Sequence, residues 1–203
     1  MTILVFILLA YLLGSVSFAV VSSWLFKLPD PRTYGSKNPG ATNVLRSGKK
    51  AAAVLTLVGD AGKGWLAVAL ALYFAPLWGL GGEAVAGAAL AVFLGHVFPV
   101  FLRFQGGKGV ATAVGVLLGL SLWVGLLAIA TWLLVAFVWR YSSLSALVAA
   151  ALAPIYTLSI LGLGSSMIAV LIMSLVLVWR HQSNIMNLMQ GKEGRIGQKS
   201  SSS

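Results

Sequence analysis

Long apolar runs alternate with short polar segments along the whole chain. The apolar runs cover residues 2–26, 51–75, 84–102, 110–139 and 144–179, and a glycine- and serine-rich break divides the last run at residues 162–166. A transmembrane helix needs about 20 mostly apolar residues, so each run is long enough to cross a membrane. The pattern predicts an all-α polytopic membrane protein with a single integral membrane domain over residues 1–199. The serine-rich residues 200–203 are predicted to form a disordered tail.

The positions of the cations predict how many times the chain crosses the membrane. Lysine and arginine concentrate on the cytoplasmic side of membrane proteins, and the polar segment 27–50 carries six of the 14 in this chain. If that segment is cytoplasmic, then Lys108, Arg140 and Arg180 share its side only when residues 110–139 and 144–179 each cross twice. We therefore predict seven transmembrane helices, with the N-terminus outside and the C-terminus inside.

The run from Gly109 to Trp139 is short for two crossings. It has 31 residues, whereas two full spans need about 40. We therefore expect a short fourth helix, preceded by a glycine-rich loop at residues 106–109 that dips below the membrane surface. Irregular backbone at that depth is tolerated only within protein or beside a water-filled cavity. The helix that begins near Val110 would direct its N-terminal amide groups into this cavity, as an anion site requires.

The amino-acid composition excludes several classes of function. The chain is 59% hydrophobic and has only four acidic residues, two histidines and no cysteine, so we expect no disulfide, no metal site and no cysteine nucleophile. Its net charge of +10 would suggest a nucleic-acid partner in a soluble protein. Here the cations lie between apolar runs, so they indicate membrane orientation, and we expect no nucleic acid to bind.

Polar residues crowd into residues 35–46, within the first cytoplasmic segment. This stretch combines two glycines with the hydrogen-bonding side chains of Ser36, Asn38, Thr42 and Asn43 and the cations of Lys37 and Arg46. A basic loop alone is usually a solvated cytoplasmic segment. The density of hydrogen-bonding side chains and glycines favours a binding site.

A second polar stretch, Gly106-Gly107-Lys108-Gly109, places glycines on both sides of a lysine. Flexible backbone that exposes amide groups next to a cation suits a phosphate. The alternative is a helix–helix turn with a lysine that extends to the membrane surface. The stretch is not a nucleotide-binding P-loop, because Lys108 is followed by glycine, and residues 59–64 fail the same test. We therefore predict no nucleotide-hydrolysis site.

One pair of ionisable residues and one single histidine lie inside apolar runs. Asp60 and Lys63, at i and i+3, either form an intrahelical ion pair or orient a cation of the site. His96 is either a hydrogen-bonded packing residue or part of the site.

Two further polar groups mark helix ends. Arg180, His181 and Asn184 have the spacing of one helical face, which is also typical of an interfacial amphipathic end. Ser142 or Ser143 would cap the following helix, and that capped N-terminus would suit an anion.

All these polar groups fall at the predicted cytoplasmic ends of the helices. A transporter needs polar groups along a pathway through both leaflets, and the outer side of this chain has no comparable set. The pattern indicates a cytoplasm-facing site for an anionic, phosphorylated substrate whose other part is lipid. Two alternatives stay open, which are a membrane transporter for a phosphorylated metabolite and a non-catalytic lipid-binding protein.

Three stretches resemble the motifs of one family. Residues 35–46 are similar to GSxNxGATNxxR, residues 106–112 to GGKGVAT, and residues 180–188 to RHxxNIxxL. From about residue 11 to residue 197 the chain resembles the bacterial acyl-phosphate:glycerol-3-phosphate acyltransferases (the PlsY type). The fold of that family, seven helices with the N-terminus outside, agrees with the count from the cations.

The resemblance implies transfer of a fatty acyl group from acyl phosphate to the 1-hydroxyl of sn-glycerol 3-phosphate. The products would be 1-acylglycerol 3-phosphate (lysophosphatidic acid) and phosphate, in the first step of phospholipid synthesis. It implies a multi-pass protein of the bacterial cytoplasmic (inner) membrane, with its active site facing the cytoplasm and with no cofactor. The enzyme that makes acyl phosphate is a possible partner at the basic inner face.

The resemblance and the polar pattern together give the candidate site residues. The candidates for catalysis are Lys108, Arg46, His181 and Asn184, and those for substrate binding are Ser36, Asn38, Thr42, Asn43, Gly106, Gly107, Gly109, Ser143 and Arg180. Secondary candidates are Asp60, Lys63 and His96. The proton acceptor is left open among His181, His96, Asp60 and the donor phosphate, of which we favour the phosphate. Because no Ser-His-Asp order is present, we expect direct transfer without an acyl-enzyme.

Overall fold

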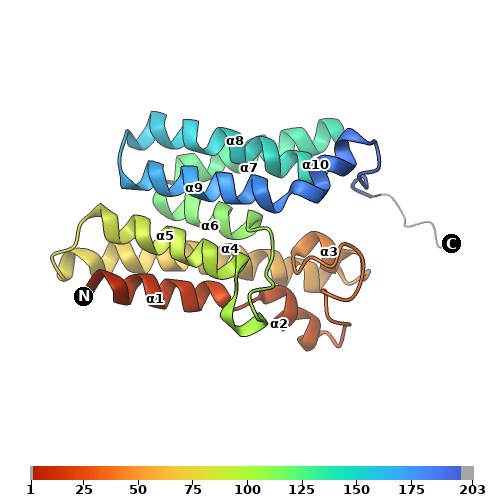
Figure 1. Cartoon of the computed structure of the whole chain (residues 1–203), viewed down its shortest axis with the longest axis horizontal. Coiled ribbons are helices and arrows are strands. Elements are labelled where there is room, and N and C mark those ends of the chain that lie inside the picture. Colours follow the sequence, from red (N-terminus) through yellow and green to blue (C-terminus); the bar gives the residue numbers. More distant parts are fainter. Residues whose placement is uncertain (1, 198–203) are drawn as a thin grey trace.

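The computed structural model describes residues 2–197, and all the regular structure in that range is helical (Figure 1). The predicted disordered tail, residues 200–203, lies outside the described residues. The helices are α1 (Thr2–Ser15), α2 (Phe18–Leu25), α3 (Ala41–Leu45), α4 (Lys50–Leu77), α5 (Gly82–Val97), the 3₁₀ turn η1 (Val100–Leu102), α6 (Val110–Leu120), α7 (Leu122–Trp139), α8 (Ser142–Leu161), α9 (Ser165–Arg180) and α10 (Gln182–Met189).

Most helix ends fall where the sequence predicts them. The run 110–139 divides at Ser121, and the last run divides at residues 162–164. The first run is not one helix, because the backbone becomes extended at Ser17 and separates α1 from α2. The third run ends its α-helix at Val97, since proline at position 99 has no amide hydrogen and disfavours helical backbone in the preceding residue. The short helix α3 was not predicted.

The helices form two layers (Figure 1). Helices α1, α4 and α5 lie in one layer, α7, α8 and α9 in the other, and α6 lies between them in contact with α4 and α7. Helix α6 packs very closely on α4, because a Cβ atom at Gly115 would overlap the carbonyl oxygen of Ala61. Small residues permit this approach of two helices in a membrane protein. The short, glycine-containing helix therefore holds the two layers together.

Large apolar side chains face outward, and small ones fill the core. Alanines make up much of the buried set, whereas Phe137 is 86% exposed and Leu134 is 64% exposed. A surface of this kind is compatible with lipid and not with water. Five helical segments among the described residues are long and apolar enough to span a membrane, or six if α9 and α10, bent by 57°, are one span. Helix α6, with 11 residues, is short, as the sequence predicts.

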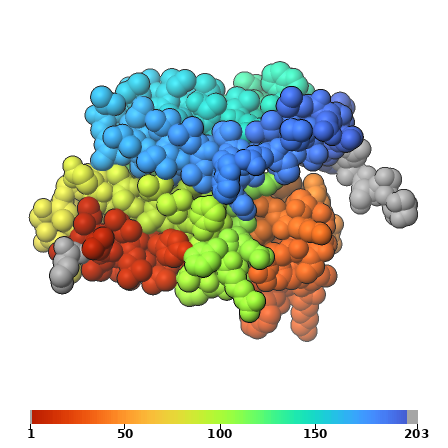
Figure 2. Space-filling view, viewed as in Figure 1, coloured from red at the N-terminus to blue at the C-terminus, as the bar shows by residue number. Residues whose placement is uncertain are grey.

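The two ends of the bundle differ in character. The segments around α3 and α10, which carry many of the cations, lie at one end, and the α4–α5 and α8–α9 turns lie at the other (Figure 1). The loop between α5 and α6 lies on the same side of the bundle's middle as α3 and α10. In Figure 2 the green surface of this loop meets the blue surface of the α9–α10 region. The polar segments therefore converge on the junction of the two layers.

Candidate active site

The glycine-rich loop between α5 and α6 is folded back onto α5. The amide of Gly107 donates to the carbonyl oxygen of His96 at 3.2 Å. Gly109 has a φ of 89°, which glycine adopts without strain, and a Cβ atom there would overlap the ring of Phe93. The amide of Gly107 is thus used within the protein, and the loop presents Lys108 at the start of α6.

Lys108 begins a chain of hydrogen bonds that joins three segments. Its Nζ donates to Oδ1 of Asn184 in α10. Asn184 Nδ2 donates to Oε1 of Glu193 at 2.7 Å, and Ser143 Oγ at the start of α8 donates to the same oxygen at 2.5 Å. The structure therefore brings together residues of the second motif, the third motif and α8, with Lys108 and Asn184 76 positions apart in the sequence.

Positive charge dominates this cluster. Arg180 donates from a guanidinium nitrogen to the carbonyl oxygen of Gly106 at 3.1 Å, and its buried Nε has no hydrogen-bond partner among the described residues. Burial lowers the pKa of the Lys108 ammonium below its usual range. Glu193 raises this pKa, and the charges of Arg180 and Arg46 lower it further. The charges of two arginines and one carboxylate therefore act on Lys108, and this excess of positive charge makes the cluster suited to an added anion.

His181 lies at the bend between α9 and α10. It is 3% exposed, and its Nδ1 is 2.8 Å from the carbonyl oxygen of Leu177. A carbonyl oxygen only accepts hydrogen bonds, so Nδ1 donates and Nε2 carries the lone pair of a neutral ring. The prediction that Arg180, His181 and Asn184 share one helical face is wrong, because the helix bends by 57° between α9 and α10. The bend nevertheless leaves these residues beside the glycine-rich loop.

The first motif contains one residue that organises the segment itself. Asn43 is 2% exposed, its Oδ1 accepts from the Ser36 amide at 2.9 Å, and its Nδ2 donates to the carbonyl oxygens of Pro31 and Tyr34 at 2.7 and 3.2 Å. Both ends of this amide are therefore bonded to backbone. Ser36 itself is exposed on the surface of the segment.

The other polar residues of the first motif lie around this organised segment. Thr42 Oγ1 is 3.4 Å from Ser142 Oγ, which connects the segment to α8. Asn38 is half-buried beside Gly40, and Arg46 is exposed.

The start of α8 differs from the prediction. Helix α8 begins at Ser142, the N-cap residue is Tyr141, and no side chain caps the helix. The expectation of a serine cap is wrong, because the hydroxyl of Ser143 is bonded to the carboxylate of Glu193. A charged acceptor forms a stronger hydrogen bond than a neutral one.

Glu193 is a member of the cluster that sequence reasoning missed. It follows α10, in a segment that returns to the bundle, where the Ile196 amide donates to the carbonyl oxygen of Arg140 at 2.7 Å. Glu193 is one of only four acidic residues in the chain. That scarcity was the one signal available, since nothing in the local sequence predicts that this segment folds back.

The secondary candidates lie beneath the loop and outside the cation cluster. Lys63 Nζ is 2.8 Å from Asp60 Oδ1, so the predicted intrahelical pair is confirmed. His96 Nδ1 lies 3.4 Å from the same oxygen. Asp60, Lys63 and His96 are 1%, 3% and 6% exposed, respectively. The loop would therefore lie between these three residues and a substrate bound in the cation cluster.

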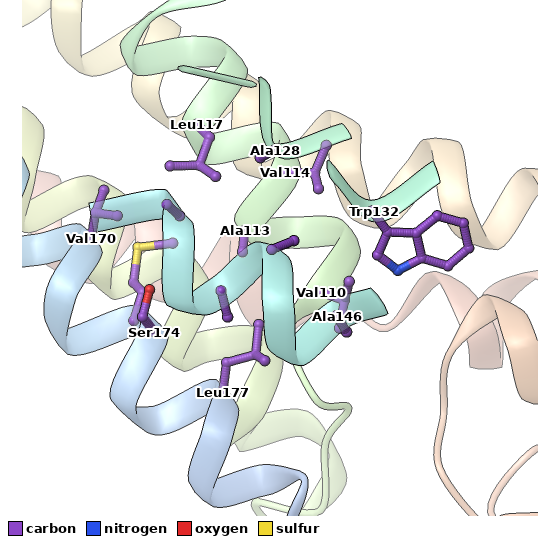
Figure 3. A pocket seen from close by; sticks show the side chains of 14 residues that line it. Val110, Ala113, Val114, Leu117, Ala128, Trp132, Ala146, Val170, Ser174 and Leu177 are labelled. Carbon is purple, nitrogen blue, oxygen red and sulfur yellow. The ribbon is translucent and has the colours of Figure 1, made fainter. Parts of the chain in front are cut away.

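An apolar crevice runs between α6, α7, α8 and α9 (Figure 3). Its lining residues are Val110, Ala113, Val114, Leu117, Ala128, Trp132, Ala146, Ala149, Ala150, Ala153, Val170, Met173, Ser174 and Leu177. Along the chain it begins two residues after Lys108 and three after Ser143. Its volume is about 30 Å³, so a chain-like ligand would enter only by moving the lining side chains apart. The site thus has a cationic part and an adjoining apolar part.

Known proteins resemble this chain over nearly its whole length. A family model described as glycerol-3-phosphate acyltransferase matches residues 4–191. The glycerol-3-phosphate acyltransferase of Nitrosospira multiformis is 66% identical over 202 residues, covering 100% of both chains. The corresponding protein of Nitrosomonas europaea is 65% identical over 196 residues, covering 97% of this chain and 98% of its own.

Two crystal structures are similar in fold. Both are of PlsY (YgiH), described as an integral membrane glycerol 3-phosphate acyltransferase. The glycerol 3-phosphate form has a TM-score of 0.89 and 34% identity, and the lysophosphatidic acid form has a TM-score of 0.87 and 34% identity. Each match covers 97% of this chain and 96% of the other.

Proposed function

The chain belongs to the glycerol-3-phosphate acyltransferase family, and we propose that its cation cluster and apolar crevice together form the acyl-transfer site. It is an integral membrane acyltransferase that acylates glycerol 3-phosphate to lysophosphatidic acid, a step of phospholipid synthesis. The observation that carries the site assignment is the convergence of Lys108, Asn184, Ser143 and Glu193 beside the crevice. We propose acyl phosphate as the acyl donor.

Charge neutralisation is the first task of such a site. Glycerol 3-phosphate and acyl phosphate both carry phosphate, so bringing them together costs Coulomb repulsion. Lys108, Arg180 and Arg46 supply three positive charges that offset this repulsion. Arginine and lysine hydrogen bonds to phosphate are also among the stronger ones in proteins. Asn43 contributes indirectly, because it shapes the segment that carries Ser36 and Arg46.

The apolar crevice suits the acyl chain of the donor. Its lining is almost wholly aliphatic and aromatic, and Trp132 stands at one side of it (Figure 3). Burial of each methylene group stabilises a bound chain by about 0.8 kcal/mol. A chain held here would place its carboxyl carbon near Lys108 and Ser143, where the crevice begins. We expect Ala150→Phe to lower kcat/KM for long-chain acyl phosphate more than for short-chain acyl phosphate.

The reaction needs no covalent intermediate with the enzyme. The 1-hydroxyl oxygen of glycerol 3-phosphate attacks the acyl carbonyl carbon, the bond from that carbon to the phosphate oxygen breaks, and phosphate leaves with the electron pair. The hydroxyl proton passes to the departing phosphate, and the unprotonated Nε2 of His181 is the alternative acceptor. Catalysis then rests on positioning and on electrostatic stabilisation of the developing negative charge.

A donor comparison tests this reaction. Purified protein receives glycerol 3-phosphate with acyl phosphate, acyl-CoA or acylated carrier protein, and lysophosphatidic acid and free phosphate are measured. We expect product only with acyl phosphate, with one phosphate released for each product formed. Product formation with acyl-CoA or carrier protein, but not with acyl phosphate, would overturn the donor assignment.

We propose seven membrane crossings, with the N-terminus outside and the site open to the cytoplasm of a bacterial inner membrane. The grouping of α3 and α10 at one end of the bundle, with the glycine-rich loop on the same side of its middle, supports this orientation (Figure 1). The same basic end would face an enzyme that supplies acyl phosphate. Because the chain has no cysteine, single cysteines at Gly81 and Ser47 provide a direct test. In intact cells an impermeant thiol reagent should label the first and not the second.

A further inference from the structure

The two glycines before Lys108 rest directly on one buried histidine. A Cβ atom at Gly107 would overlap the imidazole ring of His96, and its three nearest neighbours all belong to that ring. A Cβ atom at Gly106 would overlap the His96 carbonyl oxygen, which already accepts the Gly107 amide at 3.2 Å. The height of the loop above α5 is therefore set by His96, and Lys108 is the next residue along.

The ring of His96 is in turn held by a buried ion pair in α4. Its Nδ1 lies 3.4 Å from Asp60 Oδ1, the oxygen that also lies 2.8 Å from Lys63 Nζ. Nδ1 has no hydrogen-bond partner among the described residues, so the Asp60 carboxylate acts on the ring through its charge. The ring lies between the ion pair, on its Nδ1 side, and Gly107, on its Nε2 side.

The ion pair is anchored where the first membrane run is interrupted. Lys63 Nζ donates to the carbonyl oxygen of Val16 at 2.6 Å, and the amide of Phe18 donates to Asp60 Oδ1 at 3.4 Å. These are backbone groups released by the break between α1 and α2. Burial of an ion pair is costly, and such pairs are retained in several proteins because they select one arrangement over others. Here the pair connects α1, α2 and α4 to the histidine that supports the loop.

We propose that His96 is a positioning residue for acyl transfer, held by the Asp60–Lys63 pair, and that it sets the location of Lys108 by supporting Gly107. The role rests on the proposed function of Lys108. It also removes His96 from the candidates for the proton acceptor, since the loop covers the ring and His96 is 6% exposed. A displacement of about 1 Å at a catalytic group lowers rates by about 100-fold, so a change in this support should be measurable.

A double-mutant cycle between positions 96 and 107 tests the proposal. Gly107→Ala alone should lower kcat/KM by about 100-fold, because the added methyl group displaces the loop from the ring. In His96→Ala protein the ring is absent, so adding Gly107→Ala should cause little further loss. If Gly107→Ala lowers kcat/KM by the same factor in both backgrounds, His96 does not support the loop and the proposal is wrong.

Two further measurements separate positioning from a merely structural or a chemical role. Val92→Ala removes an equally buried side chain one turn earlier in α5 and should lower thermal stability without changing kcat/KM. His96→Asn, which keeps a donor that can face Asp60, should recover part of the activity that His96→Leu loses. The pH dependence of kcat/KM should keep its shape in His96→Leu at a lower level, whereas loss of its acidic limb would make His96 the base and overturn the proposal.

The double-mutant cycle can still be interpreted if the proposed acyl-transfer function is wrong. Wild-type protein that forms no lysophosphatidic acid from acyl phosphate would disprove the donor assignment before any variant is made. Protection against heat by glycerol 3-phosphate reports binding at the loop without turnover. If the losses of this heat protection in His96→Ala and Gly107→Ala are also non-additive, His96 positions the loop. If they are additive, the proposal is wrong.

Discussion

Two lysines in this protein each lie close to an acidic residue, yet their surroundings differ completely. Lys63 is 3% exposed and is bonded to Asp60 and to the carbonyl oxygen of Val16. Lys108 is half-buried, is bonded to Asn184 and is separated from Glu193 by that side chain. One ammonium group is enclosed by protein partners, and the other lies at the edge of a cluster with excess positive charge.

The difference separates a structural lysine from a substrate-binding one. A phosphate cannot reach Lys63, which is 3% exposed, without unpacking the helices around it, whereas Lys108 needs only to exchange one amide partner. Sequence motifs alone do not make this distinction, because both lysines are preceded by glycine, at Gly62 and Gly107. Burial and bonding decide it. The contrast predicts that removal of Lys63 affects folding, and that removal of Lys108 affects turnover.

Removing Lys63 should have the largest effect on stability. Lys63→Met leaves the Asp60 carboxylate buried without its cation, which costs about 3–5 kcal/mol. Adding Asp60→Asn replaces the stranded charge with a neutral group and should restore most of the loss. Thermal unfolding in detergent, followed by tryptophan fluorescence, measures both variants. Lys192→Met, at an exposed lysine, is the control and should unfold at the wild-type temperature. If Lys63→Met protein also unfolds at that temperature, Lys63 is not a structural lysine.

Removing Lys108 should have the largest effect on catalysis. Lys108→Ala deletes a cation at the place where negative charge develops, so kcat/KM should fall by about 100- to 1000-fold. Glu193 keeps its hydrogen bonds from Ser143 and Asn184, and the unfolding temperature should therefore stay within a few degrees of wild type. Initial rates with acyl phosphate and glycerol 3-phosphate provide the measurement. Wild-type turnover by this variant would remove Lys108 from the site.

Much of the fold follows from patterns that act locally. Apolar runs and their breaks predict the positions of α4, α7, α8 and α9, since lipid leaves the helix as the way to satisfy backbone groups. The break at Ser17 was not foreseen, because no proline or glycine marks it and its released carbonyl is satisfied by Lys63, which is 47 residues away. Long-range partners of this kind are not visible in a hydropathy pattern.

Prediction of the candidate site has the same limit: local motifs are found from the sequence, and long-range partners are not. The motifs point correctly to Lys108, Asn184 and Arg180 as neighbours, because ionisable and polar side chains at membrane depth are costly and mark sites. They do not separate Asn43, whose amide is bonded to backbone, from residues whose side chains are free for a ligand. They also miss Glu193, which enters the cluster only because the chain folds back after α10.

Removing the hydroxyl of Ser143 should have a smaller effect than removing Lys108. Ser143→Ala leaves Glu193 with its bond from Asn184, so the loss in kcat/KM should be about 10-fold, the size expected for one hydrogen bond to a charged group. Ser145→Ala is the matched control, because that hydroxyl donates to the carbonyl oxygen of Tyr141, the N-cap residue of the same helix, and not to Glu193. Equal rates for the two variants would show that Glu193 does not organise the site.

The smallest expected effect is a shift in pH dependence, and it reports directly on the environment of Lys108. Burial lowers the pKa of this ammonium, so activity that needs its charge should decline with rising pH earlier than an ordinary lysine would allow. Glu193 raises that pKa and Arg46 lowers it. Glu193→Gln should therefore move the alkaline limb of kcat/KM to lower pH, and Arg46→Gln should move it to higher pH. Both variants lower the overall rate, so the position of the limb, relative to each variant's own plateau, is the quantity to compare. Shifts in the same direction would mean that the limb reports another group, and that Lys108 does not titrate within the cation cluster.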